Sequence, residues 1–266
     1  MIDENCISDI QNEASLLLDE LNISELPINP FEIANKLDIA LRPMPDNVKS
    51  ASGMLMNFQS EFLIGYPTRI QNEGYIRFSV GHELGHYRLP GHASAVINEN
   101  GQHFSRAGFV TNDSYELEAD YFSASLLMPE DQFTKALLKM PNGLIGIDRL
   151  RKLCITSLEA TAIRYTRFAQ YPVVVIRSNG RNVDYSFMSR SFRALPNIRW
   201  LKKYSCIPIN STSYTFVNDS KKINKSGRTV GTSDIREWFL GESFDLVEEV
   251  VKLGRSGKIL TVMYPK

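Results

Sequence analysis

The sequence is poor in the residues that build disulfide frameworks and sulfur-ligated metal sites. It has three cysteines in 266 residues, and Cys6, Cys154 and Cys206 lie far apart with no CxxC pattern. An odd and scattered set of this kind predicts reduced thiols and argues against a disulfide-stapled secreted domain. We therefore expect a cytoplasmic protein.

Membrane and export signals are also missing. No apolar run approaches the roughly 20 residues that a membrane helix needs. The opening stretch MIDENCISDIQNE is acidic and has no basic segment followed by an apolar one, which argues against a signal peptide. Hydrophobic residues make up 43% of the chain and charged residues 23%, as is typical of a folded globular protein without a membrane partner.

The net charge is zero, but each end of the chain lacks one sign of charge. Residues 1–60 carry ten acidic residues against three basic ones, whereas residues 181–230 carry ten basic residues against two acidic ones. This asymmetry suggests two functional regions, and the basic stretch could bind an acidic protein or nucleic acid. A solvated face of a second domain explains the same pattern, and we favour it over direct DNA binding.

Hydrophobic periodicity predicts an α+β protein. Up to residue 170 the expected elements are an amphipathic helix at 8–21, a short helix from Pro30, strands at 39–44, 52–58 and 61–66, a mostly buried helix at 75–89, a polar loop at 91–112, helices at 115–128 and 129–140, and two further helices. After Tyr171 they are a hairpin turning at Asn179–Gly180, helix-like segments at 236–243 and 244–254, and a final strand KILTVMY.

Histidine is scarce as well, and its distribution is informative. The chain has four histidines, and three of them lie in GHELGHYRLPGH, residues 81–92. His82 and His86 form an HExxH motif on a predicted helix, where two imidazoles one turn apart can bind one zinc ion. Zinc lowers the pKa of a bound water to about 7, so Glu83 can accept its proton. A pair of core histidines is the alternative, but burying Glu83 beside them would be costly without a metal.

Two residues compete to be the third protein ligand. His92 lies six residues after the second histidine, the spacing of HExxHxxGxxH, but Leu89 stands where that motif needs glycine to leave the helix. Glu116 begins an ExxxD pattern on the next helix, and Asp120 one turn later can orient a ligand histidine. Glu118 is offset by about 200° from Glu116 on an ideal helix, so both cannot face the metal. A solvated helix charge is the alternative explanation of Glu116.

The motifs in their order resemble a known family. RFSVGHELGHYRL, followed about thirty positions later by ELEADYFSASLLMPED, is similar to the ImmA/IrrE-type zinc metallopeptidases of bacteria and their mobile elements. The likeness spans roughly residues 10–140 and includes PINPFEIANKLDIAL, SGML and LIGYP. Carried over residue by residue, it implies metal ligands at His82, His86 and Glu116, the general base at Glu83, and an outer partner of a ligand at Asp120.

The resemblance also implies a fold and a function. We expect a zincin-like metallopeptidase domain at residues 1–140, a helical segment resembling a helix-turn-helix at 141–170, and a C-terminal α/β regulatory or sensor-like domain, of a GAF-like kind, at 171–266. The implied activity is zinc-dependent cleavage or inactivation of a helix-turn-helix repressor, which derepresses stress or mobile-element genes. An unidentified donor, with tyrosine as a candidate, would assist the oxyanion.

Three further expectations concern ligands and alternatives. A site of two histidines and one glutamate accepts Zn²⁺ but also Mn²⁺ or Fe²⁺. A small-molecule effector could act through residues 171–266, although no ligand signature is readable there. The rival function is a non-proteolytic regulator that binds a repressor or DNA and keeps a structural metal site. Glu83 speaks against that rival, because a structural site closes with four protein ligands and needs no base.

Overall fold

The computed structural model describes residues 3–45, 48, 51–106, 108, 113–219, 227–254 and 257–266. The chain divides into two compact units, the first made of Met1–Leu138 and Leu150–Ala160 and the second of Lys139–Arg149 and Thr161–Lys266. Both units mix helices with strands, so the predicted α+β class is confirmed. None of the helices in the described ranges is both long and apolar enough to cross a membrane.

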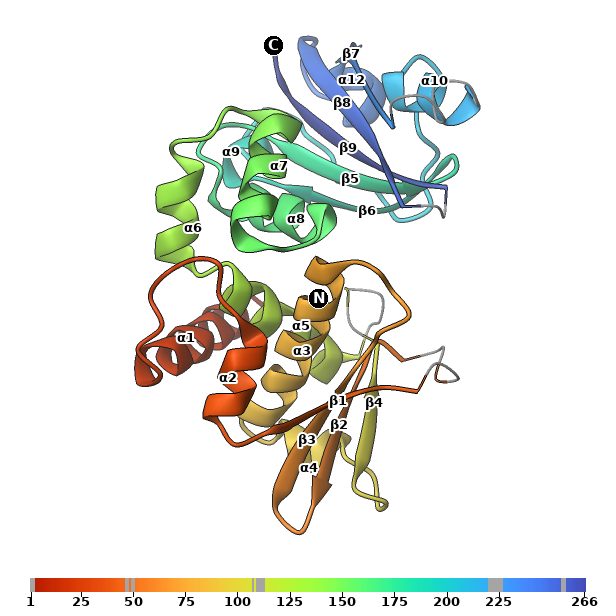
Figure 1. Ribbon diagram of the computed structural model, residues 1–266. Helices are drawn as coiled ribbons and strands as arrows, with labels where there is room; N and C mark the ends of the chain where they lie inside the picture. Colours follow the sequence, from red (N-terminus) through yellow and green to blue (C-terminus); the bar gives the residue numbers. More distant parts are fainter. Residues whose placement is uncertain are drawn as a thin grey trace. The chain divides into compact units, whose positions relative to one another are not determined.

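The first unit contains a four-stranded sheet with helices packed on one face (Figure 1). The strand order is β1-β3-β2-β4, with β1 parallel to β3 and the other neighbours antiparallel. In chain order the elements are α1 (Glu4–Glu20), α2 (Pro30–Lys36), β1 (Ala40–Pro43), β2 (Gly53–Phe58), β3 (Glu61–Tyr66), α3 (Glu73–Arg88), α4 (His92–Val96), β4 (Gln102–Ser105), α5 (Ser114–Leu127) and α6 (Glu130–Leu137).

Most of these elements follow the predicted pattern, and two do not. The three predicted strands are β1, β2 and β3, and Asn29 caps α2 with Pro30 at its start, as expected. The predicted loop at 91–112 instead contains the short helix α4 and the edge strand β4. These pieces have five and four residues, too short for a hydrophobic period to show, and β4 is defined by its pairing with β2.

The core of the first unit joins the sheet to α1, α3 and α5. Its buried side chains come from the inward faces of these elements and are fully or almost fully shielded from solvent. Helix α1 buries one apolar face, whereas α3 and α5 are buried on most of their circumference, and the burial of these apolar side chains stabilises the unit. The core includes Leu17, Leu18, Ile33, Leu55, Ile64, Val80, Leu84, Phe122 and Leu126.

Two glycines of α3 set its separation from α5. A β-carbon at Gly85 would lie 3.1 Å from the Cα of Ala119 and 3.2 Å from the side chain of Phe122. One turn earlier, a β-carbon at Gly81 would lie 2.6 Å from the hydroxyl of Ser123. Helices α3 and α5, side by side in Figure 1, can therefore approach closely only because both positions lack a side chain.

The second unit is built on a five-stranded antiparallel sheet in the order β6-β5-β9-β8-β7. The predicted hairpin is present, with Gly180 in the left-handed conformation at its turn (φ +56°). The remaining elements, in chain order, are α7 (Gly143–Cys154) and α8 (Leu158–Phe168), each divided between the units, then β5 (Val174–Asn179), β6 (Asn182–Met188), α9 (Arg190–Arg193), α10 (Thr212–Asn218), β7 (Arg228–Asp234), α12 (Ile235–Trp238), β8 (Asp245–Leu253) and β9 (Lys258–Pro265).

The predicted helix at 244–254 is wrong, because this segment forms the interior strand β8. Glu248 and Glu249 gave the segment an apparently polar helix face, yet both are buried. The carboxylate of Glu248 accepts hydrogen bonds from Ser213, at its amide and its hydroxyl, and from the hydroxyl of Ser233. With these charges satisfied internally, the branched valines pack on both faces of the strand.

A substitution at Gly85 tests the close approach of the two helices. In a helix interior Ala is ordinarily more stable than Gly by about 0.5–1 kcal/mol. We expect Gly85→Ala to lower the free energy of unfolding by about 1–3 kcal/mol, because the added methyl group must push α5 away. Urea denaturation measures the difference, and a stabilised variant would contradict the packing described here.

Candidate metal centre

The HExxH histidines meet a glutamate from α5 in the interior of the first unit. The Nε2 atoms of His82 and His86 lie 3.1 Å apart, because side chains four residues apart share one face of α3. The carboxylate of Glu116 lies 3.5 Å from Nε2 of His82 and 3.3 Å from Nε2 of His86. One ligand atom from each of the three residues fits within 4.8 Å, and all three residues are buried.

Helix α5 begins where it must to present Glu116. The side chain of Asp113 caps the helix by accepting a hydrogen bond from the amide of Glu116 at 3.2 Å, which fixes Glu116 in the first turn. The carboxylate of Glu116 accepts hydrogen bonds from Nε2 of His103 and from the amide of Arg106, both at 2.8 Å. The candidate ligand is therefore held from both helices and from the end of β4.

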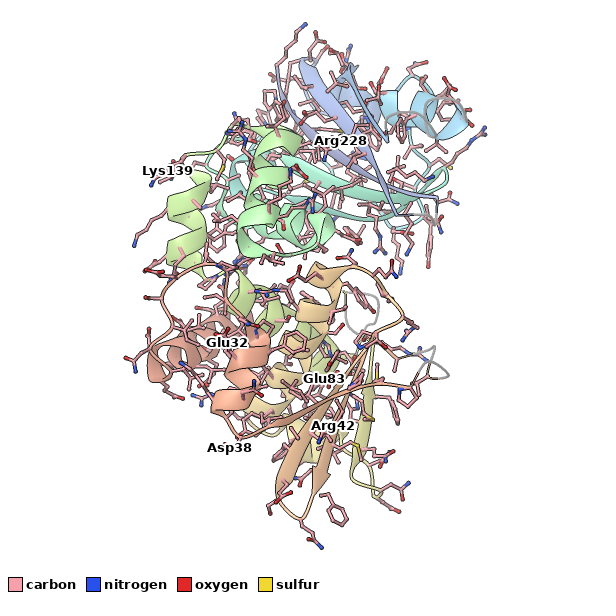
Figure 2. The ribbon with its side chains drawn as sticks, in the orientation of Figure 1. Glu32, Asp38, Arg42, Glu83, Lys139 and Arg228 are labelled. Carbon is pink, nitrogen blue, oxygen red and sulfur yellow. The ribbon has the colours of Figure 1, made fainter. Side chains whose placement is uncertain are left out.

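Glu83 is the one acid of this cluster that lacks hydrogen bonds. It is fully buried between α3 and the sheet (Figure 2), and neither carboxylate oxygen has a partner among the described residues. Gly53 of β2 makes room for it, since a β-carbon there would overlap Oε1 of Glu83. Burial raises the pKa of Glu83 to about 7. A carboxylate with such a pKa can exchange a proton near neutral pH.

The surroundings shift the pKa values of His82, His86 and Glu116 in different directions. Burial alone would lower the pKa of His82, but hydrogen bonds to Asp120 and Glu116 raise it to about 10. Burial lowers the pKa of His86 to about 3. Burial would raise the pKa of Glu116, but hydrogen bonds from His103, His82 and His86 outweigh it and hold its pKa well below the usual range. These shifts favour a protonated His82 and an ionised Glu116 beside a neutral His86.

The outer ring nitrogens of both candidate ligands have partners. Nδ1 of His82 lies 2.9 Å from Oδ1 of Asp120, which also accepts from the amide of Gly108 at 2.8 Å. His92, the rival third ligand, is buried at the start of α4, with its Nδ1 3.3 Å from Nδ1 of His86. It therefore faces the outer side of His86 and is absent from the set of candidate ligand atoms.

His103 is a residue of the site that sequence reasoning missed. It lies on β4 opposite Leu55 of β2, so it faces the helices, and its ring centroid is 4.8 Å from that of His86. Because β4 had been expected to be loop, nothing placed His103 near the HExxH motif. The scarcity of histidine was the available signal: all four histidines of the chain converge on this site.

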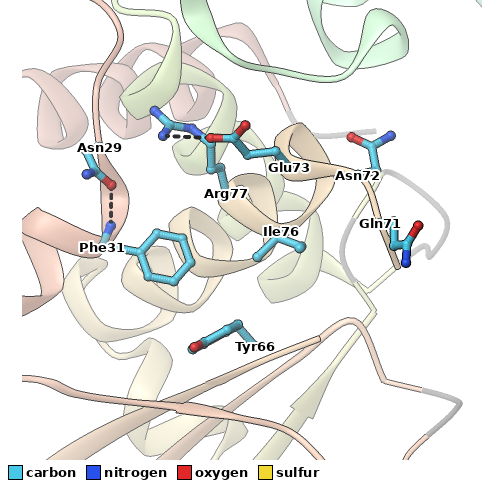
Figure 3. A pocket seen from close by; sticks show the side chains of 8 residues that line it. All are labelled: Asn29, Phe31, Tyr66, Gln71, Asn72, Glu73, Ile76 and Arg77. Atoms are coloured by element: carbon cyan, nitrogen blue, oxygen red, sulfur yellow. Dashed lines mark hydrogen bonds and ion pairs between the residues drawn. The ribbon is translucent and has the colours of Figure 1, made fainter. Parts of the chain in front are cut away.

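A pocket lies at the N-terminal end of α3, away from the metal-ligand cluster, and has a different character (Figure 3). Its volume is about 640 Å³, and it holds one carboxylate, Glu73, 3.9 Å from the guanidinium of Arg77. Its described lining residues include no histidine or cysteine, so they lack the donors of a transition-metal site. Its lining residues are Asn29, Phe31, Tyr66, Gln71, Asn72, Glu73, Ile76 and Arg77.

The donor set at His82, His86 and Glu116 fits a divalent cation. Two imidazoles and a carboxylate are the ligands of catalytic zinc sites, which leave one position open to water. The unpartnered carboxylate of Glu83 beside this set is what such a water would need. The hydroxyl of Ser105 on β4 is also buried with no close hydrogen bond in the described structure, and it lies near enough to Glu83 to lower the pKa of that carboxyl in part.

Comparisons with known proteins identify a family and a similar fold. A structure titled "Mycobacterium tuberculosis transcriptional regulator" is similar in fold, with a TM-score of 0.62 and 12% sequence identity, over 97% of this chain and 76% of that one. None of the curated proteins searched matches the chain. The family model described as "IrrE N-terminal-like domain" matches residues 34–166, which include all the residues of the metal centre. The chain thus belongs to the IrrE N-terminal-like family, Peptidase_M78, a family related to metallopeptidases.

Proposed function

We propose that this protein is a zinc-dependent endopeptidase whose metal ligands are His82, His86 and Glu116. The observation that carries the proposal is the buried carboxylate of Glu83, which has no hydrogen-bond partner and a raised pKa beside a complete donor set. A purely structural role for the three ligands would leave the burial of Glu83 uncompensated. The donor set also suits Mn²⁺ or Fe²⁺, and zinc is the ion proposed here.

Each residue of the site has a separate role in the proposed hydrolysis of a peptide bond. A divalent metal supplies Lewis-acid chemistry, lowering the pKa of water to about 7 and polarising a carbonyl. Glu83 accepts a proton from the attacking water as the new C–O bond forms, and it returns that proton to the leaving amine as the C–N bond breaks. Asp120 accepts a hydrogen bond from His82 and holds that imidazole in one orientation.

We infer that the substrate is a helix-turn-helix transcriptional repressor, cleaved or inactivated in the cytoplasm to derepress stress or mobile-element genes. The family likeness supports this substrate class, as does the similar fold of a protein titled a transcriptional regulator. We further propose functional domains at residues 1–140 and 171–266, joined by a helical segment at 141–170. The C-terminal domain, with its five-stranded sheet, would sense a small effector in a GAF-like manner.

A non-proteolytic regulator is the second candidate function. Five exposed basic side chains, with no acidic residue between Asp184 and Asp219, support binding of an acidic partner or DNA: Arg190, Arg193, Arg199, Lys202 and Lys203. DNA binding by the full chain would weaken steeply with salt, because each phosphate contact releases counterions. The absence of DNA binding at low salt would dispose of the DNA-binding form of this candidate.

The donor set predicts one tightly bound metal ion per chain. Loss of a residue that only hydrogen-bonds to a metal ligand weakens metal binding by about 10–100-fold. Because Glu116 is proposed as a ligand itself, we expect Glu116→Gln to weaken Zn²⁺ binding at least about a hundredfold. Glu73→Gln is the matched control, since Glu73 lies on α3 with a side chain that is 70% exposed. Competition with a chromophoric chelator measures both affinities. Equal affinities for the two variants would rule Glu116 out as a ligand.

Removing the base should separate metal binding from cleavage. Glu83→Gln keeps the size of the side chain and the metal ligands, so we expect Zn²⁺ to bind while cleavage falls about 10²–10⁴-fold. The assay incubates metal-loaded protein with the helix-turn-helix repressor encoded beside it and follows the fragments by mass spectrometry. If wild-type protein leaves the repressor intact under inducing conditions, or if Glu83→Gln cleaves it equally well, the peptidase proposal fails.

Cleavage should also depend on pH in a defined direction. Because burial raises the pKa of Glu83 to about 7, this base is protonated and inactive at lower pH. A bound cation can only lower that pKa, so kcat/KM should rise with pH along an acid limb whose midpoint is no higher than about 7. Metal content measured at each pH separates this effect from loss of zinc. An acid limb whose midpoint lies clearly above pH 7, with metal retained, would contradict Glu83 as the base.

A further inference from the structure

His92 forms a bridge between a candidate metal ligand and an acid on the outer side of α5. Its Nδ1 lies 3.3 Å from Nδ1 of His86, and its Nε2 lies 3.0 Å from Oε2 of Glu118. The His92 side chain is only 2% exposed, and the ring of Tyr115 packs edge-on against its imidazole at a centroid distance of 5.0 Å. The side chains of Glu118, His92 and His86 therefore form a continuous hydrogen-bonded row that ends at His86.

The chain geometry after α3 holds His92 in this place. The amide of Leu89 still bonds to the carbonyl of Gly85, and Gly91 then takes a left-handed conformation (φ +79°) that starts α4. Because Leu89 is not the glycine of the longer zinc motif, the chain turns two residues later than that motif requires. His92 consequently approaches His86 from behind, at Nδ1, and not from the side of Nε2.

Metal binding fixes the direction of every hydrogen bond in the row. If Nε2 of His86 gives its lone pair to a metal, the ring proton must be on Nδ1, and His86 then donates to Nδ1 of His92. His92 must carry its own proton on Nε2, where it donates to the carboxylate of Glu118. The reverse polarity would place the proton of His86 on Nε2 and block the metal. An acid at the far end selects the polarity that permits binding.

We propose that His92 and Glu118 are positioning residues, which hold His86 in the tautomer and orientation that bind the metal. This inference rests on the proposed metal centre and extends it. His82 has the shorter equivalent, a direct contact with Asp120. Glu118 cannot reach His86 itself because it lies on another face of α5 from Glu116, and His92 spans the gap. Outer partners of this type change metal affinity by about 10–100-fold.

Zinc affinity of the full chain tests the inference without reference to proteolysis. The variants are His92→Phe, which removes both hydrogen bonds, His92→Asn, whose amide can keep an acceptor near Nδ1, and Glu118→Leu, which removes the distal acid. Ser94→Ala is the matched control, since Ser94 is exposed on the same short helix. Affinity for Zn²⁺ is measured by chelator competition, the absorption spectrum of the Co²⁺ form reports ligand geometry, and circular dichroism confirms folding.

We expect His92→Phe and Glu118→Leu to bind Zn²⁺ about 10–100-fold more weakly and to change the Co²⁺ spectrum, with His92→Asn closer to wild type. Ser94→Ala should match wild type in both measurements. Folded His92→Phe and Glu118→Leu variants with unchanged affinity and spectrum would overturn the positioning role while leaving the metal centre intact. Complete loss of binding in His92→Phe would overturn it in favour of a direct ligand. Wild-type protein that binds no Zn²⁺ would defeat the metal proposal itself.

Discussion

The close approach of α3 and α5 is the constraint on which the rest of the site depends. Gly81 and Gly85 remove the side chains that would separate the two helices. Glu116, in the first turn of α5, is thereby brought within 3.3–3.5 Å of two imidazole nitrogens that α3 presents one turn apart. A wider spacing would leave the same three residues buried but unable to share one cation, at a considerable cost in desolvation.

Burial on this scale explains the polar network around the cluster. Each candidate ligand has an outer partner: Asp120 for His82, His92 for His86 and His103 for Glu116. Such partners satisfy buried polar atoms and also fix the orientation of the inner ones. Glu83 is the exception in this network, since both of its oxygens are unpartnered in the described structure. A buried acid left unsatisfied within an otherwise satisfied network is where chemistry is expected.

Sequence patterns predicted those residues of the site whose positions follow from helix periodicity. HExxH places His82 and His86 on one face of a helix, and spacing left His92 and Glu116 as rival partners until the family resemblance favoured Glu116. The roles of His103 and the His92–Glu118 contact depend on β4 and α4, which are too short to show a period. In the second unit, β8 was mistaken for a helix because sequence cannot show that Glu248 and Glu249 are satisfied internally.

The central claim is that one metal ion lies between α3 and α5 with Glu83 beside it. Anomalous diffraction at the zinc absorption edge, from crystals grown with Zn²⁺, measures this directly. We predict a single strong peak about 2.0–2.2 Å from Nε2 of His82, Nε2 of His86 and a carboxylate oxygen of Glu116. A peak ligated by His92 in place of Glu116, or no peak between these helices, would contradict it.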